Sequence, residues 1–208
     1  MRCSLCKGFT TEFLIYENRK FVQCEKCKAI LLLPEFFLNA EVEKSRYALH
    51  NNDITDPRYK NFVSPITSHI TENFPTWSTG LDFGCGTGPV AAVELQKRGY
   101  SVKLYDPFFE DHPEVLSKKY NFIICCEVME HFHHSHREFQ LLSNLLLPGG
   151  KLYCKTILFF EKMDFEKWHY KNDPTHVIFY TPQSLEWIKS NFGFSDLSTD
   201  LKLIIFTK

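Results

Sequence analysis

The sequence predicts an α/β fold built around a mostly parallel sheet, with a small cysteine-rich module ahead of it. Apolar runs suited to buried strands alternate with helical patterns over the larger, C-terminal part of the chain. Four cysteines fall in two C-x2-C pairs within the first 27 residues. The length of 208 residues suits one core domain and a small appendage, and the 44% hydrophobic content suffices for a packed core.

The N-terminal cysteines have the spacing of a metal site. The pattern C-x2-C-x17-C-x2-C is formed by Cys3, Cys6, Cys24 and Cys27. Each pair fits a tight knuckle, and short strands at 13–16 and 19–23 flank a turn at Asn18. Four thiolates favour tetrahedral Zn²⁺, as in a zinc ribbon, and leave no open position for catalysis. We therefore predict a structural zinc ribbon over residues 1–33 whose metal supplies folding energy, with disulfides or unconnected thiols as alternatives.

The strand and helix pattern of the rest can be placed from apolar runs, caps and breakers. We predict strands at 80–84, 101–106, 121–127 and 151–156, and a final antiparallel pair at about 194–199 and 201–207. Helices are predicted over 89–98, 112–118, 135–146 and 182–191, the last with Thr181 as cap and Pro182 at its first position.

A glycine-rich loop follows the first of these strands. Residues 81–88 read Leu-Asp-Phe-Gly-Cys-Gly-Thr-Gly, and Asp106 ends the next strand. A loop almost without side chains lets backbone N–H groups approach a ligand closely, and an acid at Asp106 is placed as one that binds ribose hydroxyls. The third glycine comes one residue too early for the dinucleotide pattern G-x-G-x-x-G. We therefore expect another adenosine-type cofactor, with a purely structural tight turn as the alternative.

Three motifs in order resemble those of class I S-adenosylmethionine (SAM)-dependent methyltransferases. The D-x-G-x-G-x-G run from Asp82 resembles their first motif. The segments Glu127-Val-Met-Glu-His131 and Leu146-Leu-Pro-Gly-Gly-Lys-Leu152 resemble their "EVLEH … LKPGG" signature. The resemblance covers about residues 60–208 and implies a Rossmann-like methyltransferase sheet. It implies that the glycine loop faces the methionine part of SAM and that Asp106 bridges both ribose hydroxyls. The expected cofactor-binding residues are Asp82, Gly84, Cys85, Gly86, Gly88, Asp106, Pro107 and Glu127.

One departure from that family concerns the edge of the sheet. Only about fourteen residues separate Asp106 from the next strand, where full-length methyltransferases place a helix, a strand and another helix. We therefore expect a sheet shortened at one edge. Asp111 or the backbone near 108–110 would have to replace the acid that the outer strand often offers to adenine. Phe108 and Phe109 are candidates to pack on the purine, with ordinary core packing as the alternative.

Residues 34–60 are predicted to be a linker that carries a lid helix, ahead of a methyltransferase domain over 61–208. Asn39 would cap a helix over 39–50, and a second helix over 58–74 would be interrupted near Pro65. In similar methyltransferases this segment lies over the open end of the cofactor site. The lid candidates are Tyr47, His50 and Asn51; a polar linker is the alternative.

Two regions offer residues for chemistry. Methyl transfer from a sulfonium is an in-line displacement, so the enzyme chiefly orients the partners and supplies a base where the nucleophile carries a proton. Glu130 and His131 follow the central strand, where similar proteins meet substrate; helix capping is the alternative. His176 lies in an insert that resembles the "G-T-H … F" loop of ubiquinone-biosynthesis-like methyltransferases, with Asp-Pro in place of the usual Gly.

His176 is the first choice for a base or an acceptor-orienting group, with Asp173 fixing its tautomer; a structural histidine bonded within the loop is the alternative. The tract from His131 to His136 also suggests a second metal site, but a solvated turn is the better interpretation because no cysteine lies near it.

The net charge, the apolar runs and the N-terminal residues indicate which kinds of partner and which cell compartment to expect. A net charge of −1 gives no overall drive toward nucleic acid or anionic membrane. The sequence contains no run of eighteen apolar residues, so we expect no membrane-spanning helix. The N-terminus does not have the pattern of a signal peptide. We therefore expect a cytoplasmic protein with reduced cysteines.

The function predicted from the sequence is SAM-dependent transfer of a methyl group to an oxygen, nitrogen or carbon atom of a small-molecule acceptor. Methylation of an RNA base is one alternative, since some rRNA guanine methyltransferases carry an N-terminal four-ligand zinc module. A non-catalytic binding module with a SAM fold is the other, motivated by the shortened sheet. The acceptor atom and the oligomeric state are not determined by the sequence.

Overall fold

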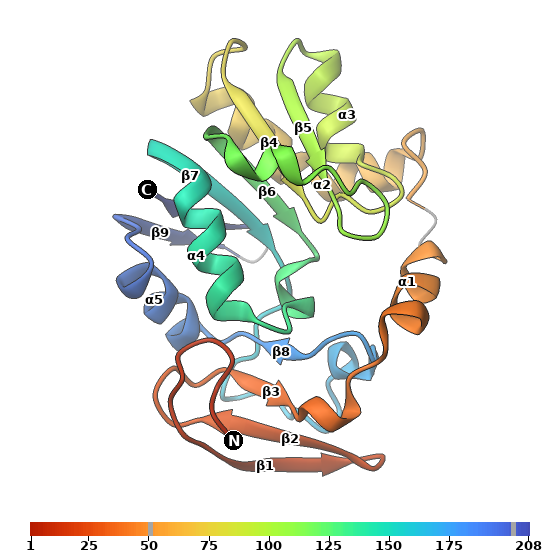
Figure 1. Ribbon diagram of the computed structural model, residues 1–208, viewed down its shortest axis with the longest axis vertical. Coiled ribbons are helices and arrows are strands. Elements are labelled where there is room, and N and C mark those ends of the chain that lie inside the picture. The colour runs from red at the N-terminus through yellow and green to blue at the C-terminus, as the bar shows by residue number, and fades with distance from the viewer. Residues whose placement is uncertain (50–51, 201–202) are drawn as a thin grey trace.

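The computed structural model describes residues 1–49, 52–200 and 203–208, and it contains one large and one small sheet (Figure 1). The large sheet has six strands in the order β5-β4-β6-β7-β10-β9. Their bounds are β4 Thr79–Phe83, β5 Ser101–Tyr105, β6 Tyr120–Cys126, β7 Leu146–Lys155, β9 Asp196–Thr199 and β10 Ile204–Thr207. The first four in spatial order are parallel, and β10 runs antiparallel to both neighbours, as the sequence predicts.

Helices cover both faces of the large sheet. The helices α2 (Pro57–Asn73) and α3 (Val90–Lys97) pack on one face, and α4 (Ser135–Leu145) and α5 (Pro182–Asn191) pack on the other. Because successive side chains on a strand point to opposite faces, Phe122 and Ile124 join the first core while Ile123 joins the second. The central strand β6 is therefore buried on both sides and holds the loop that follows it.

The edge of the sheet next to β5 is short, as predicted. Between β5 and β6 the structure forms one 3₁₀ helix, η2 (Pro113–Ser117), where a short helix over 112–118 was expected. β5 is therefore the edge strand of the described sheet, next to β4 alone. The predicted α/β fold with a mostly parallel sheet, shortened at one edge, is confirmed.

The prediction that the helix over 58–74 breaks near Pro65 is wrong, because α2 runs through this residue. Proline has no N–H to bond the carbonyl four residues earlier, which here belongs to Asn61. The Ser64 hydroxyl donates to that carbonyl oxygen over 2.9 Å and compensates for the missing bond. The preceding helix α1 (Ala40–Ala48) is capped as predicted, since Asn39 Oδ1 accepts from the Val42 N–H at 3.0 Å.

The small sheet joins the N-terminal module to a strand that lies between β7 and α5 in the sequence. It contains β1 (Thr10–Tyr16), β2 (Arg19–Cys24), β3 (Ile30–Leu32) and β8 (Ile178–Phe179), all antiparallel. Glu17 and Asn18 have positive φ and form the two-residue turn between β1 and β2. Figure 1 shows this layer below the large sheet, with β8 beside β3. The N-terminal module thus pairs directly with the segment that carries His176.

Three further 3₁₀ helices are η1 (Pro34–Phe36), η3 (Met129–His131) and η4 (His169–Asn172). In the part of the chain that the structure describes, no helix has the length and apolar character needed to cross a bilayer.

Candidate functional site

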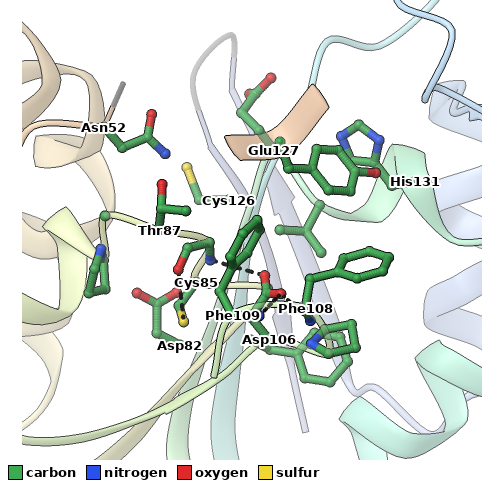
Figure 2. A pocket seen from close by; sticks show the side chains of 18 of the residues that line it. Asn52, Asp82, Cys85, Thr87, Asp106, Phe108, Phe109, Cys126, Glu127 and His131 are labelled. Carbon is green, nitrogen blue, oxygen red and sulfur yellow. Dashed lines mark hydrogen bonds between the residues drawn. The ribbon is translucent and has the colours of Figure 1, made fainter. Parts of the chain in front are cut away.

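A cleft of about 1280 Å³ opens at the carboxyl ends of β4, β5 and β6. In open α/β sheets this is the end where ligands bind. The walls come from the glycine loop, the residues after β5 and β6, and the segments around α1 and η4. Figure 2 shows the labelled side chains surrounding one common space. All eight expected cofactor residues line the cleft: Asp82, Gly84, Cys85, Gly86, Gly88, Asp106, Pro107 and Glu127.

The glycine loop is held by its neighbours through its backbone. The Gly84 N–H donates to the Tyr105 carbonyl at 2.8 Å, which ties the loop to the end of β5. Gly84 has a φ of +76°, and an added Cβ would lie 2.6 Å from the Val128 side chain. An added Cβ at Gly88 would lie 1.9 Å from the Asn52 carbonyl oxygen. Both positions therefore require glycine, one for its backbone conformation and one for the close approach of Asn52.

Asp106 connects this loop to the loop after β5. Its Oδ2 accepts from the Gly86 N–H at 3.0 Å, and its Oδ1 accepts from the N–H groups of Phe108 and Phe109 at 2.8 and 3.2 Å. A carboxylate has about four acceptor directions. In this geometry Asp106 has capacity for one ribose hydroxyl, and bridging two would require release of one backbone bond.

Asp82 and Cys85 both line the cleft, and their side chains carry little charge near neutral pH. Burial raises the pKa of the Asp82 carboxyl to about 7, and the negative charge of Asp106 adds to the effect. Burial also raises the pKa of the Cys85 thiol above its ordinary value. Near neutral pH the thiol is therefore uncharged and the carboxyl is partly protonated.

Aromatic rings occupy the side of the cleft where the outer strand is missing. Phe108 and Phe109 both line it, and the Phe108 ring lies 5.9 Å from the Tyr47 ring. Asp111 is exposed and lies outside the described lining of the cleft. Of the expected substitutes for the lost strand, the aromatic pair is therefore in place and Asp111 is not.

The helix α1 contributes side chains to the lining of the cleft and is bonded to the segment after η4, which also lines it. Arg46 binds Asp173 through two parallel bonds, Nε to Oδ1 at 2.9 Å and Nη2 to Oδ2 at 3.0 Å. Arg46 and two donors of Thr175 hold the pKa of Asp173 well below its ordinary value, despite its burial. Tyr47 lies edge-on to the His131 ring, with centroids 5.2 Å apart. The other two lid candidates, His50 and Asn51, lie outside the described residues.

Glu127 and Glu130 converge on one phenol. Glu127 follows β6 with a φ of +54°, a conformation uncommon for a side-chain-bearing residue. The Tyr170 hydroxyl bonds Glu130 Oε1 and also lies 3.2 Å from Glu127 Oε2. Burial and the charge of Glu127 raise the pKa of Glu130 to about 8. The capping alternative for Glu130 is wrong, because the side chain is fully buried and α4 starts after His134 without it.

His131 and His176 face each other beside this acid pair. Their ring centroids lie 4.9 Å apart, and both rings line the cleft. His131 Nδ1 lies 3.0 Å from the Thr175 carbonyl, and His176 Nδ1 lies 2.7 Å from the Tyr170 carbonyl. A carbonyl only accepts, so each Nδ1 donates. The Tyr170 carbonyl therefore holds the Nδ1 proton of His176, and the expected role of Asp173 toward this ring stays a prediction.

Sequence reasoning missed Arg46, Asn52 and Tyr170. Each acts through a contact that is distant along the chain: Arg46 and Asp173 are 127 positions apart, and Tyr170 and Glu130 are 40 apart. The only sequence signal was the polar and aromatic character of the insert around Tyr170.

The four N-terminal cysteines form a compact thiolate group. They are buried, and their sulfur atoms lie within 4.8 Å of one another. The two knuckles repeat the same backbone geometry: the N–H groups of Lys7 and Lys28 each donate to the carbonyl of the first cysteine at 3.0 Å, and both lysines have φ near +60°. The Gly8 N–H also donates to Cys6 Sγ at 3.4 Å. This donor set fits a structural Zn²⁺ with four sulfur ligands.

The cleft also fits SAM, both in the space over its glycine loop and in the hydrogen-bonding groups that it offers. An added Cβ on Gly86 would meet nothing closer than Asn52 Nδ2 at 4.0 Å, so the space over the loop is open to a ligand. Asp106 offers an acceptor for a ribose hydroxyl, and the cleft extends from there to the two histidines.

Comparisons with known proteins agree with this fold. A family model described as a methyltransferase domain matches residues 25–199. The curated ubiquinone biosynthesis O-methyltransferase of Pectobacterium atrosepticum is 30% identical over 79 residues, which is 38% of this chain and 33% of that protein. That of Serratia proteamaculans is 28% identical over the same shares of the two chains. The chain thus spans about a third of the length of these relatives.

Solved structures show the same fold at low identity. A SAM-dependent methyltransferase from Archaeoglobus fulgidus aligns with a TM-score of 0.54 at 18% identity, over 72% of this chain and 94% of that one. The magnesium protoporphyrin IX methyltransferase of Synechocystis, solved with bound S-adenosylhomocysteine, aligns with a TM-score of 0.52 at 16% identity, over 84% and 96%. The chain belongs to the methyltransferase-domain family, with the fold of class I SAM-dependent methyltransferases.

Proposed function

We propose that the protein transfers the methyl group of SAM to a small-molecule acceptor. One observation carries this proposal: the glycine loop with Asp106 and the pair His131–His176 line the same cleft, one group for a cofactor and the other for an acceptor. The helix α1, tied down through Arg46, covers that cleft and favours a small acceptor over a long polymer. We favour oxygen as the acceptor atom, because the curated relatives are named O-methyltransferases.

When bound, SAM supplies an electrophilic methyl group on a sulfonium. The residues of this chain then have three tasks. Asp106 and the glycine loop orient the nucleoside, and α1 excludes water from the cleft. His176 is placed to orient the acceptor or take its proton, because Nδ1 donates to the Tyr170 carbonyl and the neutral ring therefore carries its lone pair on Nε2. A positioned base of this kind contributes about 10²–10⁴-fold in rate.

Cofactor binding can be tested by calorimetry and by mass spectrometry of released ligands. We expect SAM to bind the full chain, and Asp106→Asn to weaken binding at least about tenfold, since an amide group would face the Gly86 N–H or lose the ribose contact. Asp111→Asn is the matched control, because Asp111 is exposed outside the cleft lining. The absence of binding at millimolar SAM would refute the proposal.

The two alternatives predict different results. An RNA methyltransferase would show an affinity for RNA that falls steeply with salt, whereas the chain carries a net charge of −1. A non-catalytic binding module would bind SAM without turnover, so detection of S-adenosylhomocysteine formation with any acceptor excludes it.

We also propose the division into a ribbon over 1–33, a lid segment over 34–60 and a methyltransferase domain over 61–208. The strands that precede the first limit end at Leu32, which supports it, whereas the second limit falls inside α2 (Pro57–Asn73). Cytoplasmic residence remains a proposal too, supported by free cysteines throughout the described chain.

A further inference from the structure

We propose that Glu130, His131 and His176 form a second metal site, which binds a divalent cation with nitrogen and oxygen ligands and holds the acceptor oxygen. One ligand atom from each of these residues lies within 4.8 Å of the others. Ligands bound to one cation at about 2.0–2.2 Å lie about 3–4 Å apart, so small side-chain rotations close the site. The role of the cation toward the acceptor rests on the proposed methyl transfer, whereas its binding does not.

The two histidines are oriented as metal ligands usually are. Each donates its Nδ1–H to a backbone carbonyl, His131 to Thr175 at 3.0 Å and His176 to Tyr170 at 2.7 Å. Such outer bonds fix the ring and place the lone pair of the neutral imidazole on Nε2. Both acceptors are backbone carbonyls of one insert, so the insert orients the two rings together.

The carboxylate supplies an independent observation. Glu130 is fully buried, and its Oε1 accepts from Tyr170, whereas its Oε2 has no hydrogen-bond partner among the described residues. A buried carboxylate oxygen without a partner is costly, and a bound cation satisfies it. Glu127 lies beside the same phenol, so a single hydroxyl serves two carboxylates.

The ligand types distinguish this site from the ribbon. Two imidazoles and one carboxylate suit Mn²⁺, Fe²⁺, Co²⁺ or Zn²⁺ and leave positions open, whereas four thiolates suit Zn²⁺ and leave none. Mn²⁺ prefers oxygen and nitrogen ligands over thiolates, so it can probe this site while zinc remains in the ribbon.

The position of the site indicates the class of acceptor. His131 and His176 line the cleft that contains the glycine loop, so a cation there faces the acceptor space. A cation next to a hydroxyl lowers the pKa of that hydroxyl. The acceptor oxygen then forms a bond to the methyl carbon, the carbon–sulfur bond breaks with its electron pair on sulfur, and the hydroxyl proton leaves to water. The acceptor is therefore a hydroxyl compound that can ligate a metal. Of the two tasks proposed for His176, this site selects the first, because the ring then orients the acceptor through the cation.

The test uses the full, zinc-loaded chain and titrates Mn²⁺ alone, following free Mn²⁺ by electron paramagnetic resonance. We expect one Mn²⁺ per chain with the zinc retained, and at least about tenfold weaker binding in Glu130→Gln and in His176→Gln. His134→Gln is the matched control, because His134 is an exposed histidine in the same cleft. In wild-type protein labelled with ¹⁵N-histidine, Mn²⁺ should broaden the ring signals of His131 and His176 first, a result that depends on no variant.

Two outcomes would overturn this inference: no Mn²⁺ binding at millimolar concentration, or binding that leaves the ring signals of His131 and His176 sharp. SAM binding measured on the same sample separates the two proposals. SAM binding without Mn²⁺ binding refutes the metal site alone, and Mn²⁺ binding without SAM binding refutes the proposed function alone.

Discussion

Asp82 shows how a single buried residue couples the cofactor site to pH. This residue is the last but one of β4, next to the glycine loop, and it is 5% exposed. Burial raises its pKa from 3.8 to about 7, so the folded state binds its proton more tightly than the unfolded state does. Between these two pKa values the folded state keeps the Asp82 proton and the unfolded state has lost it. The free energy of unfolding therefore falls as pH rises through this range.

We predict that Asp82→Asn becomes more stable relative to wild type as pH rises from about 4 to 7, by up to about 4 kcal/mol at 1.36 kcal/mol per pKa unit. Urea unfolding of both proteins at several pH values measures the difference. Asp111→Asn, which removes an exposed acid, should show no such trend. Parallel stability curves for Asp82→Asn and wild type would contradict the prediction.

At the scale of elements, the Arg46–Asp173 ion pair connects the proposed lid helix α1 to the segment after η4. The Arg46 guanidinium and the Asp173 carboxylate meet in a two-bond fork, and Thr175 donates to the same carboxylate at 2.7 Å. Such a pair contributes little to global stability where it is solvent-exposed, but its geometry defines where α1 lies. We infer that the fork serves closure of the cleft more than folding.

Arg46→Gln and Asp173→Asn are each expected to raise the KM for SAM or acceptor about three- to tenfold, with little change in melting temperature. The KM of the double variant should be no higher than that of the more impaired single variant, because each single substitution already removes the same contact. Lys167→Gln, which breaks an exposed ion pair with Asp164, is the control. Additive losses in the double variant would show that the two residues act separately.

At the scale of the whole molecule, the ribbon and the methyltransferase sheet share one core. The hydrophobic cluster on the α4 side contains the ribbon cysteines together with residues of β6 and β7. β3 pairs with β8 two residues after His176, and Phe21 of β2 packs on Phe179 and Phe165 at 5.9 and 5.3 Å. Arg19 also donates to the Lys171 carbonyl at 3.0 Å. The zinc ribbon therefore supports the loop that holds the proposed acceptor site.

Removal of zinc by a chelator, or Cys27→Ser, is expected to loosen that loop as well as the ribbon. Hydrogen exchange should rise at least about tenfold in residues 165–180, since the ribbon strands would no longer support β8. Amides of α3, which packs on the opposite face, serve as the internal control. Unchanged exchange at 176–180 after zinc loss would show that the loop is held without the ribbon.

Features that depend on neighbours in the chain could be predicted from the sequence. Strand β4, the glycine loop and the cap at Asn39 occupy the places their local patterns indicate. The predicted helix break at Pro65 was wrong, because the hydroxyl of the neighbouring Ser64 donates to the Asn61 carbonyl that lacks the proline's N–H. The roles assigned to the cofactor-binding and catalytic residues stay predictions, although the structure brings these residues to one cleft or its wall.

The sequence by itself determined the cysteine knuckles, the glycine loop and the order of strands and helices, because these depend on backbone conformation and on periodicities of a few residues. Only the tertiary structure decided that β3 pairs with β8, that Arg46 reaches Asp173 and that Glu130 meets His131 and His176. These contacts depend on which surfaces pack together in the folded protein, and the spacing of residues along the chain does not indicate which surfaces those are.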